Sequence, residues 1–306
     1  MCGIELNGDK IHNQRSNFNM NSKISKLILP QLANQQFVYS GIDSLDRCLD
    51  QELFAHWPHT IDYRYNSRGF RDQEWPQDLA SAIWCLGDSF TVGIGSCLEH
   101  TWPQVLSQHS QRRVITVAMD GASNEWIART ACDAYDLAGP SNIVIMWSYL
   151  HRREHPDTDL SDLDRRQHHV KSTDIQDFEN FHSCRERVHA YCANSNLIEL
   201  IIPNFSNNSF TDVAWQKTRD PSWPIQLPSS LTDCQDLYPE IAAELRTLHG
   251  LDVKGLLEFQ AIQQSHPEFL CDLIRVEYLD RARDGHHFDR ITAEWVAKQV
   301  QNLLNS

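Results

Sequence analysis

The chain has 306 residues, of which 41% are hydrophobic, and this is enough for one sizeable core. Its 41 acidic residues against 27 basic ones give a formal net charge of −14. This charge disfavours a nucleic-acid binder and a protein of anionic membrane surfaces, because both need a basic face. We therefore expect neither nucleic acid nor membrane as a partner, and a neutral or cationic substrate suits the charge better.

The nine cysteines are odd in number and widely spaced, and no Cys-x-x-Cys occurs, so we expect reduced thiols rather than a disulfide framework. The N-terminus shows no secretory signal, since its longest apolar run, residues 27–29, ends at Pro30. No apolar stretch reaches 18 residues. These features together predict a soluble, cytoplasmic protein.

Residues 1–35 are rich in Asn, Gln, Lys and Ser, which predicts a loosely ordered N-terminal arm or a short helix on the surface. Residues 36–306 are expected to form one domain. Residues 61–66 alternate like a short strand that leads into a turn at 66–69. Further along, short apolar runs predict buried strands at 82–86, 114–118, 143–147, 197–202 and 273–278. Helical patterns are found at 102–109, 126–137, 178–193, 239–249, 253–264 and 291–304.

Strands that alternate with helices predict an α/β fold with a mostly parallel sheet. Ser123 fits the N-cap of the helix at 126–137, and Gly139 fits its end. Residues 204–237 hold three prolines and many Ser and Asn, so they are expected to form an irregular, lid-like insertion. In parallel sheets the ligand site lies at the carboxyl ends of the strands, so the residues that follow each strand are the first candidates.

The strand at 82–86 runs directly into Gly87-Asp88-Ser89. The glycine permits a tight turn, and the serine falls at the carboxyl end of the strand. There it can expose its hydroxyl and offer its backbone N–H to an oxyanion. The same tripeptide also describes an ordinary turn or helix cap, so by itself it favours neither interpretation.

A nucleophilic serine needs a base, and the base needs a group that orients it. Asp284 and His287 stand three positions apart before the terminal helix, so the carboxylate can accept the proton of Nδ1 while Nε2 faces outward. His286 competes with His287, but the residue three positions before it is Arg283, which cannot accept that proton. We therefore prefer His287. The alternative is that both histidines only cap the helix.

With these two segments the chain resembles the SGNH, or GDSL-like, hydrolase family. Gly87-Asp88-Ser89 is similar to the first sequence block of the family, and Asp284-Gly285-His286-His287 is similar to its last block, Asp-x-x-His. The resemblance covers roughly residues 60–304. It implies a three-layer, flavodoxin-like fold with a central, mostly parallel five-stranded sheet. It also implies a catalytic triad of Ser89, His287 and Asp284.

Two further segments take part in the resemblance. Gly121 follows the second strand, where the family has a glycine whose backbone N–H belongs to the oxyanion hole. The segment at 65–71, Tyr-Asn-Ser-Arg-Gly-Phe-Arg, looks like a lead-in found in some bacterial members. The resemblance therefore implies backbone donors at Ser89 and Gly121.

The third block of the family, Gly-x-Asn-Asp after the third strand, has no counterpart here. Its asparagine is an oxyanion donor, and the loss of one such donor typically costs about 10²–10³ in turnover. Ser148 or Tyr149 occupies the approximate place, and Asn124 is another candidate donor. The sequence does not decide among the three. Arg152, a little further on, either binds a substrate carboxylate, belongs to a charged helix start, or buttresses the site through an Asp or Glu.

The resemblance implies a serine esterase or deacylase that works through an acyl-enzyme, without a metal or an organic cofactor. A short acyl ester, such as an O-acetyl group on a carbohydrate, is the favoured substrate. Two alternatives stay open. One is an O-acyltransferase with the same triad. The other is a non-catalytic carbohydrate-binding domain of the same fold, which the missing asparagine favours and the presence of all three triad residues disfavours.

Overall fold

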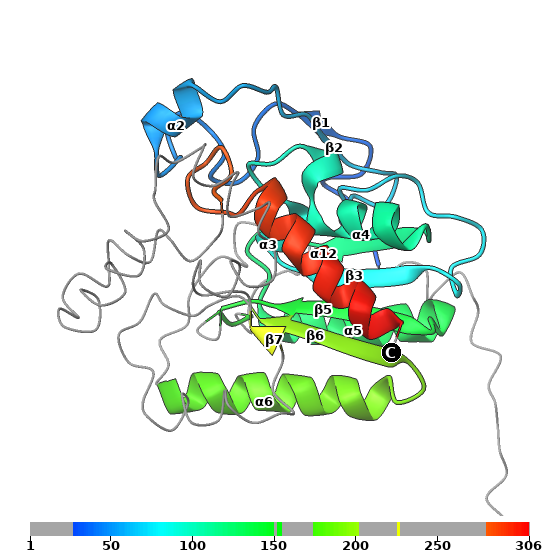
Figure 1. The fold of residues 1–306 in the computed structure, drawn as a ribbon. Helices are drawn as coiled ribbons and strands as arrows, with labels where there is room; N and C mark the ends of the chain where they lie inside the picture. The colour runs from blue at the N-terminus through cyan, green and yellow to red at the C-terminus, as the bar shows by residue number, and fades with distance from the viewer. Residues whose placement is uncertain (1–26, 150–151, 155–173, 202–224, 227–279, 306) are drawn as a thin grey trace, which may run out of the picture.

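The computed structural model describes residues 27–149, 152–154, 174–201, 225–226 and 280–305. Their centre is a parallel β-sheet (Figure 1). Its long strands, in spatial order, are β4 (Val114–Ala118), β3 (Ile83–Gly87), β5 (Asn142–Trp147) and β6 (Asn196–Ile201).

These four strands confirm the predicted ones to within one residue at each end. A two-residue strand, β7 (Ile225–Gln226), pairs in parallel with the outer edge of β6 and is the fifth strand of the sheet. The strand predicted at 273–278 lies outside the described residues, as do the helices predicted at 239–249 and 253–264.

The strand order places β3 between β4 and β5, and every neighbouring pair is parallel. The chain therefore leaves β3 toward one edge of the sheet, returns across it and continues to the other edge. Sheets of this kind bind ligands outside the carboxyl ends of the strands, at the point where the direction reverses. Here that point lies between β3 and β5.

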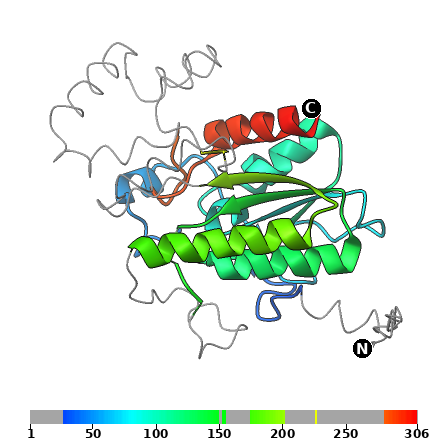
Figure 2. The same cartoon turned by 90° about the horizontal axis from the view of Figure 1, so that it is seen from below.

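Helices cover both faces of the sheet (Figures 1 and 2). One face carries α4 (Trp102–Ser110) and α12 (Arg290–Leu304), and the other carries α5 (Asn124–Ala138) and α6 (Asp174–Tyr191). Strand residues alternate between the two cores, so that Cys85 faces the first pair of helices while Trp84 and Leu86 face the second. Each helix in the described ranges is too short or too polar to cross a bilayer.

Helix α5 has the two cap residues that the sequence predicted, although the helix itself is longer than the predicted 126–137 at both ends. Ser123 is the N-cap, and its side-chain oxygen accepts a hydrogen bond from Trp126 N at 3.3 Å. At the other end Gly139 adopts a φ of +54°, the left-handed conformation that commonly follows a helix. Caps of this kind depend on local hydrogen bonds and local backbone conformation, which is why the sequence alone reveals them.

Before the sheet begins, the chain forms β1 (Gln36–Phe37), which pairs antiparallel with β2 (Tyr63–Arg64), and the short helix α2 (Gln51–Ala55). Of the predicted N-terminal arm, residues 27–35 are described. Leu27 and Leu29 are buried in the core that contains Trp84. This end of the arm is therefore part of the domain, because the domain removes its leucines from water.

The turn predicted at 66–69 is present, and two features fix it. The Asn66 side chain accepts the backbone N–H groups of Arg68 at 3.0 Å and Phe70 at 3.1 Å. Gly69 has a φ of +82°, and a Cβ at this position would clash with the backbone of Leu29. The turn therefore depends on both its asparagine and its glycine.

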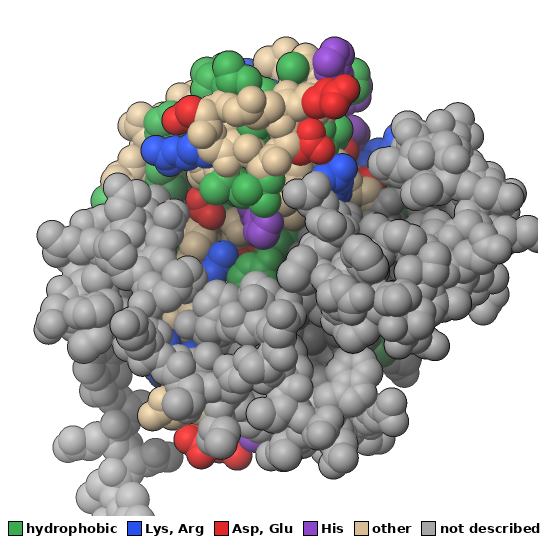
Figure 3. Space-filling view, turned by 90° about the vertical axis from the view of Figure 1, so that its left-hand side faces the viewer, with side chains coloured by type: hydrophobic (Ala, Val, Ile, Leu, Met, Phe, Trp, Pro, Cys, Tyr) green, Lys and Arg blue, Asp and Glu red, His purple; other side chains and the backbone are tan. Residues whose placement is uncertain are grey.

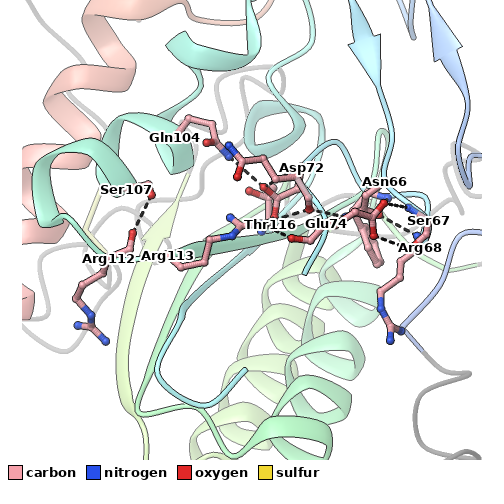
Figure 4. Close-up of polar contacts among 12 residues, drawn as sticks. Asn66, Ser67, Arg68, Asp72, Glu74, Gln104, Ser107, Arg112, Arg113 and Thr116 are labelled. Carbon is pink, nitrogen blue, oxygen red and sulfur yellow. Dashed lines mark hydrogen bonds and ion pairs between the residues drawn. The ribbon is translucent and has the colours of Figure 1, made fainter. Parts of the chain in front are cut away.

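Asp72 accepts hydrogen bonds at the outer edge of β4 (Figure 4). Its buried carboxylate accepts hydrogen bonds from Thr116 N at 3.0 Å, Arg113 Nη2 at 2.9 Å and Gln104 Nε2 at 3.2 Å. Burial raises the pKa of Asp72, while the charge and hydrogen bonds of Arg113 and the N–H of Thr116 act against this rise. Because Thr116 N belongs to an edge strand, Asp72 satisfies a donor that the sheet itself leaves open.

Candidate active site

The candidate residues follow the strands at one end of the sheet. Ser89 follows β3, Gly121 follows β4 and Ser148 follows β5, while the loop with Asp284 and His287 leads into α12. Figure 3 looks at this side of the molecule, where a histidine lies among hydrophobic side chains, with a basic and an acidic side chain close by. The fold thus brings together residues from both halves of the chain.

Ser89 is the first residue of α3 (Ser89–Val92) and is 1% exposed. Asp88 is the N-cap of this helix, and its side chain accepts a hydrogen bond from Phe90 N at 3.1 Å. Gly87 is needed for close packing, since a Cβ there would clash with the Thr91 side chain. The tripeptide therefore forms the sharp strand-to-helix turn expected from the sequence.

Asp88 also joins this turn to the segment after β5. Its Oδ2 accepts hydrogen bonds from Ser148 Oγ at 2.6 Å and Arg152 Nη1 at 2.7 Å, and Nη1 also donates to Ser148 Oγ at 2.9 Å. The Arg152 guanidinium lies over the Tyr149 ring, 4.9 Å from its centroid. Of the three roles considered for Arg152, the structure favours the one in which it supports the site by pairing with an aspartate. The ion pair compensates the buried charge of Asp88 beside Ser89.

The structure pairs Asp284 with His287 rather than with His286. Asp284 Oδ2 lies 2.6 Å from His287 Nδ1, and Oδ1 accepts the backbone N–H groups of His286 at 2.8 Å and His287 at 2.9 Å. The His286 ring packs instead near Phe90 and Tyr149, with ring centroids 5.7 and 6.5 Å apart. The spacing argument thus selected the histidine that contacts the carboxylate.

Burial and charge act in opposite directions on the pKa values of Asp284 and His287. Burial by itself would raise the pKa of Asp284, but the charge and hydrogen bonds of His287 bring that pKa below its ordinary value. For His287, burial would lower the pKa, yet the charge and hydrogen bond of Asp284 raise it overall. The pKa of His286 falls to about 3, first because the ring is buried and then because of the charge of His287. At neutral pH His286 is therefore uncharged, and His287 is the basic imidazole of the two.

The second ring nitrogen of His287, Nε2, is not the one that contacts Asp284. With Nδ1 held by Asp284, the lone pair of the neutral ring lies on Nε2. Nε2 is buried and has no hydrogen-bond partner in the part of the chain that the structure describes. The His287 ring lies 4.5 Å, between centroids, from Phe90, the residue after Ser89. Among the described residues no hydrogen bond joins Nε2 to Ser89 Oγ, and such contacts often tighten only when substrate binds.

Two of the predicted oxyanion donors are the backbone N–H groups of Ser89 and Gly121. Within the described ranges, neither Ser89 N nor Gly121 N donates to a backbone carbonyl. Asn124 is engaged elsewhere, since its Nδ2 donates to the carbonyl oxygens of Ser148 at 3.2 Å and Tyr149 at 3.4 Å, and its Oδ1 accepts from Ser148 N at 2.8 Å. The Ser148 hydroxyl is held in the Arg152 network. In this conformation both side chains tie the site together, and an oxyanion role for either stays a prediction.

A buried ion pair that the sequence analysis missed supports the Asp284 loop. Arg283 donates to Asp43 from Nε at 2.8 Å and from Nη2 at 2.6 Å, and Tyr63 donates its hydroxyl to the same carboxylate at 2.5 Å. Tyr63 Oη in turn accepts from Gly95 N at 2.8 Å, and Gly95 O accepts from Arg283 N at 3.0 Å. A separation of 240 positions between Arg283 and Asp43 leaves no local signal for this contact.

Asp120 is a second residue that the sequence analysis passed over. It follows β4 and precedes Gly121, and that place at a strand end was the available signal. Burial raises the pKa of Asp120, while the charges of His287 and Arg152 lower it, so this carboxyl belongs to the same electrostatic environment. Within the described ranges, no three His, Cys, Asp or Glu side chains are grouped as metal ligands would be.

No protein-family model and no curated protein sequence matches the chain. Among solved structures, it is similar to a protein from Desulfitobacterium hafniense DCB-2 whose description places it among lipolytic proteins of the G-D-S-L family. The identity is 14%, the TM-score is 0.37, and the similarity covers 73% of this chain and 99% of that chain. A carbohydrate esterase family 2 enzyme with a carbohydrate-binding domain, from Corynascus thermopiles (Myceliophthora fergusii), is 15% identical. Its TM-score is 0.31, with 48% of this chain and 51% of that chain covered. At this level of similarity, the chemistry has to be argued from the site.

Proposed function

We propose that this chain is an SGNH-type (GDSL-like) carboxylic ester hydrolase with a three-layer, flavodoxin-like fold. Ser89 is the nucleophile, His287 the base, and Asp284 the group that orients the base. One observation carries the proposal. At the carboxyl ends of the strands, His287 Nδ1 lies 2.6 Å from a buried carboxylate, while its buried Nε2 has no partner among the described residues. A buried polar atom left unpaired costs about 1–3 kcal/mol, so such an atom calls for an explanation.

Acylation begins when Nε2 of His287 takes the proton of Ser89 Oγ, which attacks the carbonyl carbon of the ester. The carbonyl oxygen becomes an oxyanion, for which the N–H groups of Ser89 and Gly121 are the proposed donors. Asp284 stabilises the imidazolium and stays ionised, in keeping with its lowered pKa. When the carbonyl re-forms, the bond to the alcohol oxygen breaks, and His287 protonates the leaving alcohol.

Deacylation repeats these steps with water. His287 takes a proton from a water molecule, which attacks the acyl-enzyme, and then returns the proton to Ser89 Oγ as the acid leaves. Throughout both halves, the Asp88–Arg152 ion pair at 2.7 Å holds the turn that carries the nucleophile. In this proposal Arg152 is a positioning residue rather than a catalytic one.

For the substrate we propose a short acyl ester, with an O-acetyl group on a carbohydrate favoured. The rings of Phe90 and His286 lie next to the His287 ring, 4.5 and 4.8 Å away between centroids. His286 is uncharged at neutral pH, since its pKa is about 3, and its ring is half-buried, whereas Phe90 is buried behind it. The His286 ring thus offers the aromatic surface that an acyl group or a sugar face prefers.

A fluorophosphonate, which reacts with activated serines, tests the proposal directly. Label located by mass spectrometry on Ser89 is expected for the wild type and for Ser96→Ala, a matched variant at another buried serine. Label should be absent from Ser89→Ala and strongly reduced in His287→Gln, but retained in His286→Gln. A folded wild-type protein that takes no label at Ser89 would overturn the proposal and favour the non-catalytic binding domain.

The products of the reaction distinguish a hydrolase from a transferase. The protein is incubated with p-nitrophenyl acetate, with and without an oligosaccharide acceptor. For a hydrolase, acetate appears at the same rate in both reactions. Transfer of the acetyl group to the acceptor, detected by mass spectrometry, would replace the hydrolase by the O-acyltransferase with the same triad.

A further inference from the structure

Arg71 is a buried cation just after the turn at 66–69. Its exposure is 2%, and its Cζ lies 4.3 Å from the centroid of the Tyr63 ring. Within the described ranges, every hydrogen bond of its guanidinium goes to a backbone carbonyl oxygen, and its Nε has no partner. Burial lowers the pKa of Arg71. A buried charge is costly unless its contacts are good, so the contacts indicate what this residue does.

Three of these carbonyl groups belong to the end of α3, the helix that begins with Ser89, and to the loop behind it. Nη1 donates to Val92 O at 3.2 Å and to Gly93 O at 2.5 Å, and Nη2 donates to Ser96 O at 2.8 Å. Val92 is the last residue of α3, and Gly93 is its C-cap. The last carbonyl groups of a helix have no partner within it, and a cation is favourable there. The guanidinium therefore satisfies oxygens that α3 leaves open.

The loop that follows α3 also touches the segment with the proposed base. Gly95 O accepts a hydrogen bond from Arg283 N at 3.0 Å, and Ser96 Oγ donates to Phe288 O at 3.3 Å. These two contacts lie on either side of the Asp284–His287 pair in the sequence. The loop is thus bonded to the guanidinium, to the helix with the nucleophile and to both ends of the segment with the base.

We propose that Arg71 is a positioning residue that, through the loop at 93–96, sets the distance between Ser89 Oγ and His287 Nε2. This role rests on the proposed function, in which these two residues are the nucleophile and the base. Because α3 has only four residues, a shift at its end also moves Ser89. Arg152 holds the start of the same helix through Asp88, so the two arginines fix its two ends.

The shape of the guanidinium suits this role. Its two terminal nitrogens donate in fixed directions within one plane, and they reach carbonyl groups four residues apart in the chain. A lysine carries its three donors on one nitrogen and cannot span the same oxygens. A displacement of about 1 Å, even one caused far from the chemistry, can cost about 10²-fold in rate. We therefore expect the loss of these contacts to lower kcat rather than substrate binding.

The test makes the same two substitutions at two buried arginines. Arg71→Met removes the charge, whereas Arg71→Lys keeps the charge on a single nitrogen. Arg185 is the matched control, since it is 7% exposed, lies on α6 and pairs with Glu199 of β6 at 2.7 Å. Arg185→Met and Arg185→Lys thus disturb a buried arginine in contact with other elements of the fold.

The measurements are kcat and KM for p-nitrophenyl acetate and the rate of fluorophosphonate labelling at Ser89. Each variant is assayed at a temperature at which circular dichroism shows it to be folded. Arg71→Met is expected to lower kcat and the labelling rate by about 10²-fold with KM nearly unchanged, and Arg71→Lys by about tenfold. The Arg185 variants should have a lower melting temperature and nearly unchanged kcat. If Arg71→Met does not fold, Arg71→Lys decides, because it keeps the buried charge.

Two results would overturn this role of Arg71 alone. One is a labelled wild type together with folded Arg71 variants that keep kcat and the labelling rate. The other is an equal loss of kcat in the Arg71 and Arg185 variants, which would show that lower stability explains the effect. A folded wild type that takes no label at Ser89 would overturn the proposed hydrolase, and this role with it.

Discussion

Replacing Asp284 by Asn exchanges one oxygen for an NH₂ group in a buried carboxylate and tests the proposed triad closely. Asp284 accepts three hydrogen bonds, from His287 Nδ1 at 2.6 Å and from the backbone N–H groups of His286 and His287 at 2.8 and 2.9 Å. The amide oxygen of Asn can still accept both backbone groups at the Oδ1 position. The amide nitrogen then faces Nδ1, and because it can only donate, Nδ1 must become the acceptor.

The consequence is a change of tautomer. The proton of the neutral imidazole moves to Nε2, and Nε2 can no longer take the proton of Ser89. In other Ser-His-Asp triads this change lowers kcat about 10⁴-fold, or about 5 kcal/mol in activation free energy. We expect the same magnitude here. The variant should stay folded, because the side chain keeps its size and its two backbone hydrogen bonds.

The assay is kcat and kcat/KM for hydrolysis of p-nitrophenyl acetate, with circular dichroism to confirm the fold. Asp120→Asn is the matched control. Its carboxylate acts on His287 through charge, whereas the Nδ1 contact belongs to Asp284. We expect Asp120→Asn to lose less than about tenfold, since a charge without a hydrogen bond does not fix the tautomer. If Asp284→Asn keeps activity within tenfold of the wild type, the assignment of Asp284 is refuted.

Three further predictions follow from the geometry. The pKa of His287 is raised above its ordinary value of 6.5, and a base must be neutral to accept a proton. The value of kcat/KM should therefore rise with pH, with a midpoint above 6.5. A lower midpoint would contradict the pairing of His287 with Asp284. Asp43→Asn leaves the buried charge of Arg283 uncompensated and should lower the free energy of unfolding, measured by urea titration, by about 3–5 kcal/mol. An unchanged urea midpoint would show that the ion pair does not stabilise the fold. Gly95→Ala should lower both stability and kcat, since φ is +79° and a Cβ there would crowd Ala282 and Asp284 in the loop that carries the proposed triad residues. Gly139→Ala, with φ at +54° but open space, should lower stability by only about 1–2 kcal/mol and leave kcat unchanged.

The elements of the sheet were predictable because each rests on a short local pattern. An apolar run such as Val114–Ala118 has to be buried on both faces, and a parallel strand covered by helices on both sides satisfies this need. The caps of α5 at Ser123 and Gly139 are local in the same sense. By contrast, the burial of Leu27 and Leu29 was not predicted, because the polar composition around them concealed two leucines that reach the core.

For the site, the sequence by itself determined the parts whose geometry lies within a few residues. These are the Gly87-Asp88-Ser89 turn at the end of β3, and the choice of His287 over His286 as the partner of Asp284. In both cases a backbone turn of three or four residues fixes where the side chains point. A turn of that length allows few alternatives.

The tertiary structure alone decided which charges meet in the interior. It paired Arg283 with Asp43 and Arg152 with Asp88, across 240 and 64 positions, and it engaged the amide of Asn124 with the backbone after β5. Each of these groups is costly to bury unless a partner of the right kind is present, so the pairing is strict once the fold exists. The sequence does not show it, because the partner is chosen by the packing of distant segments and not by any pattern within one of them.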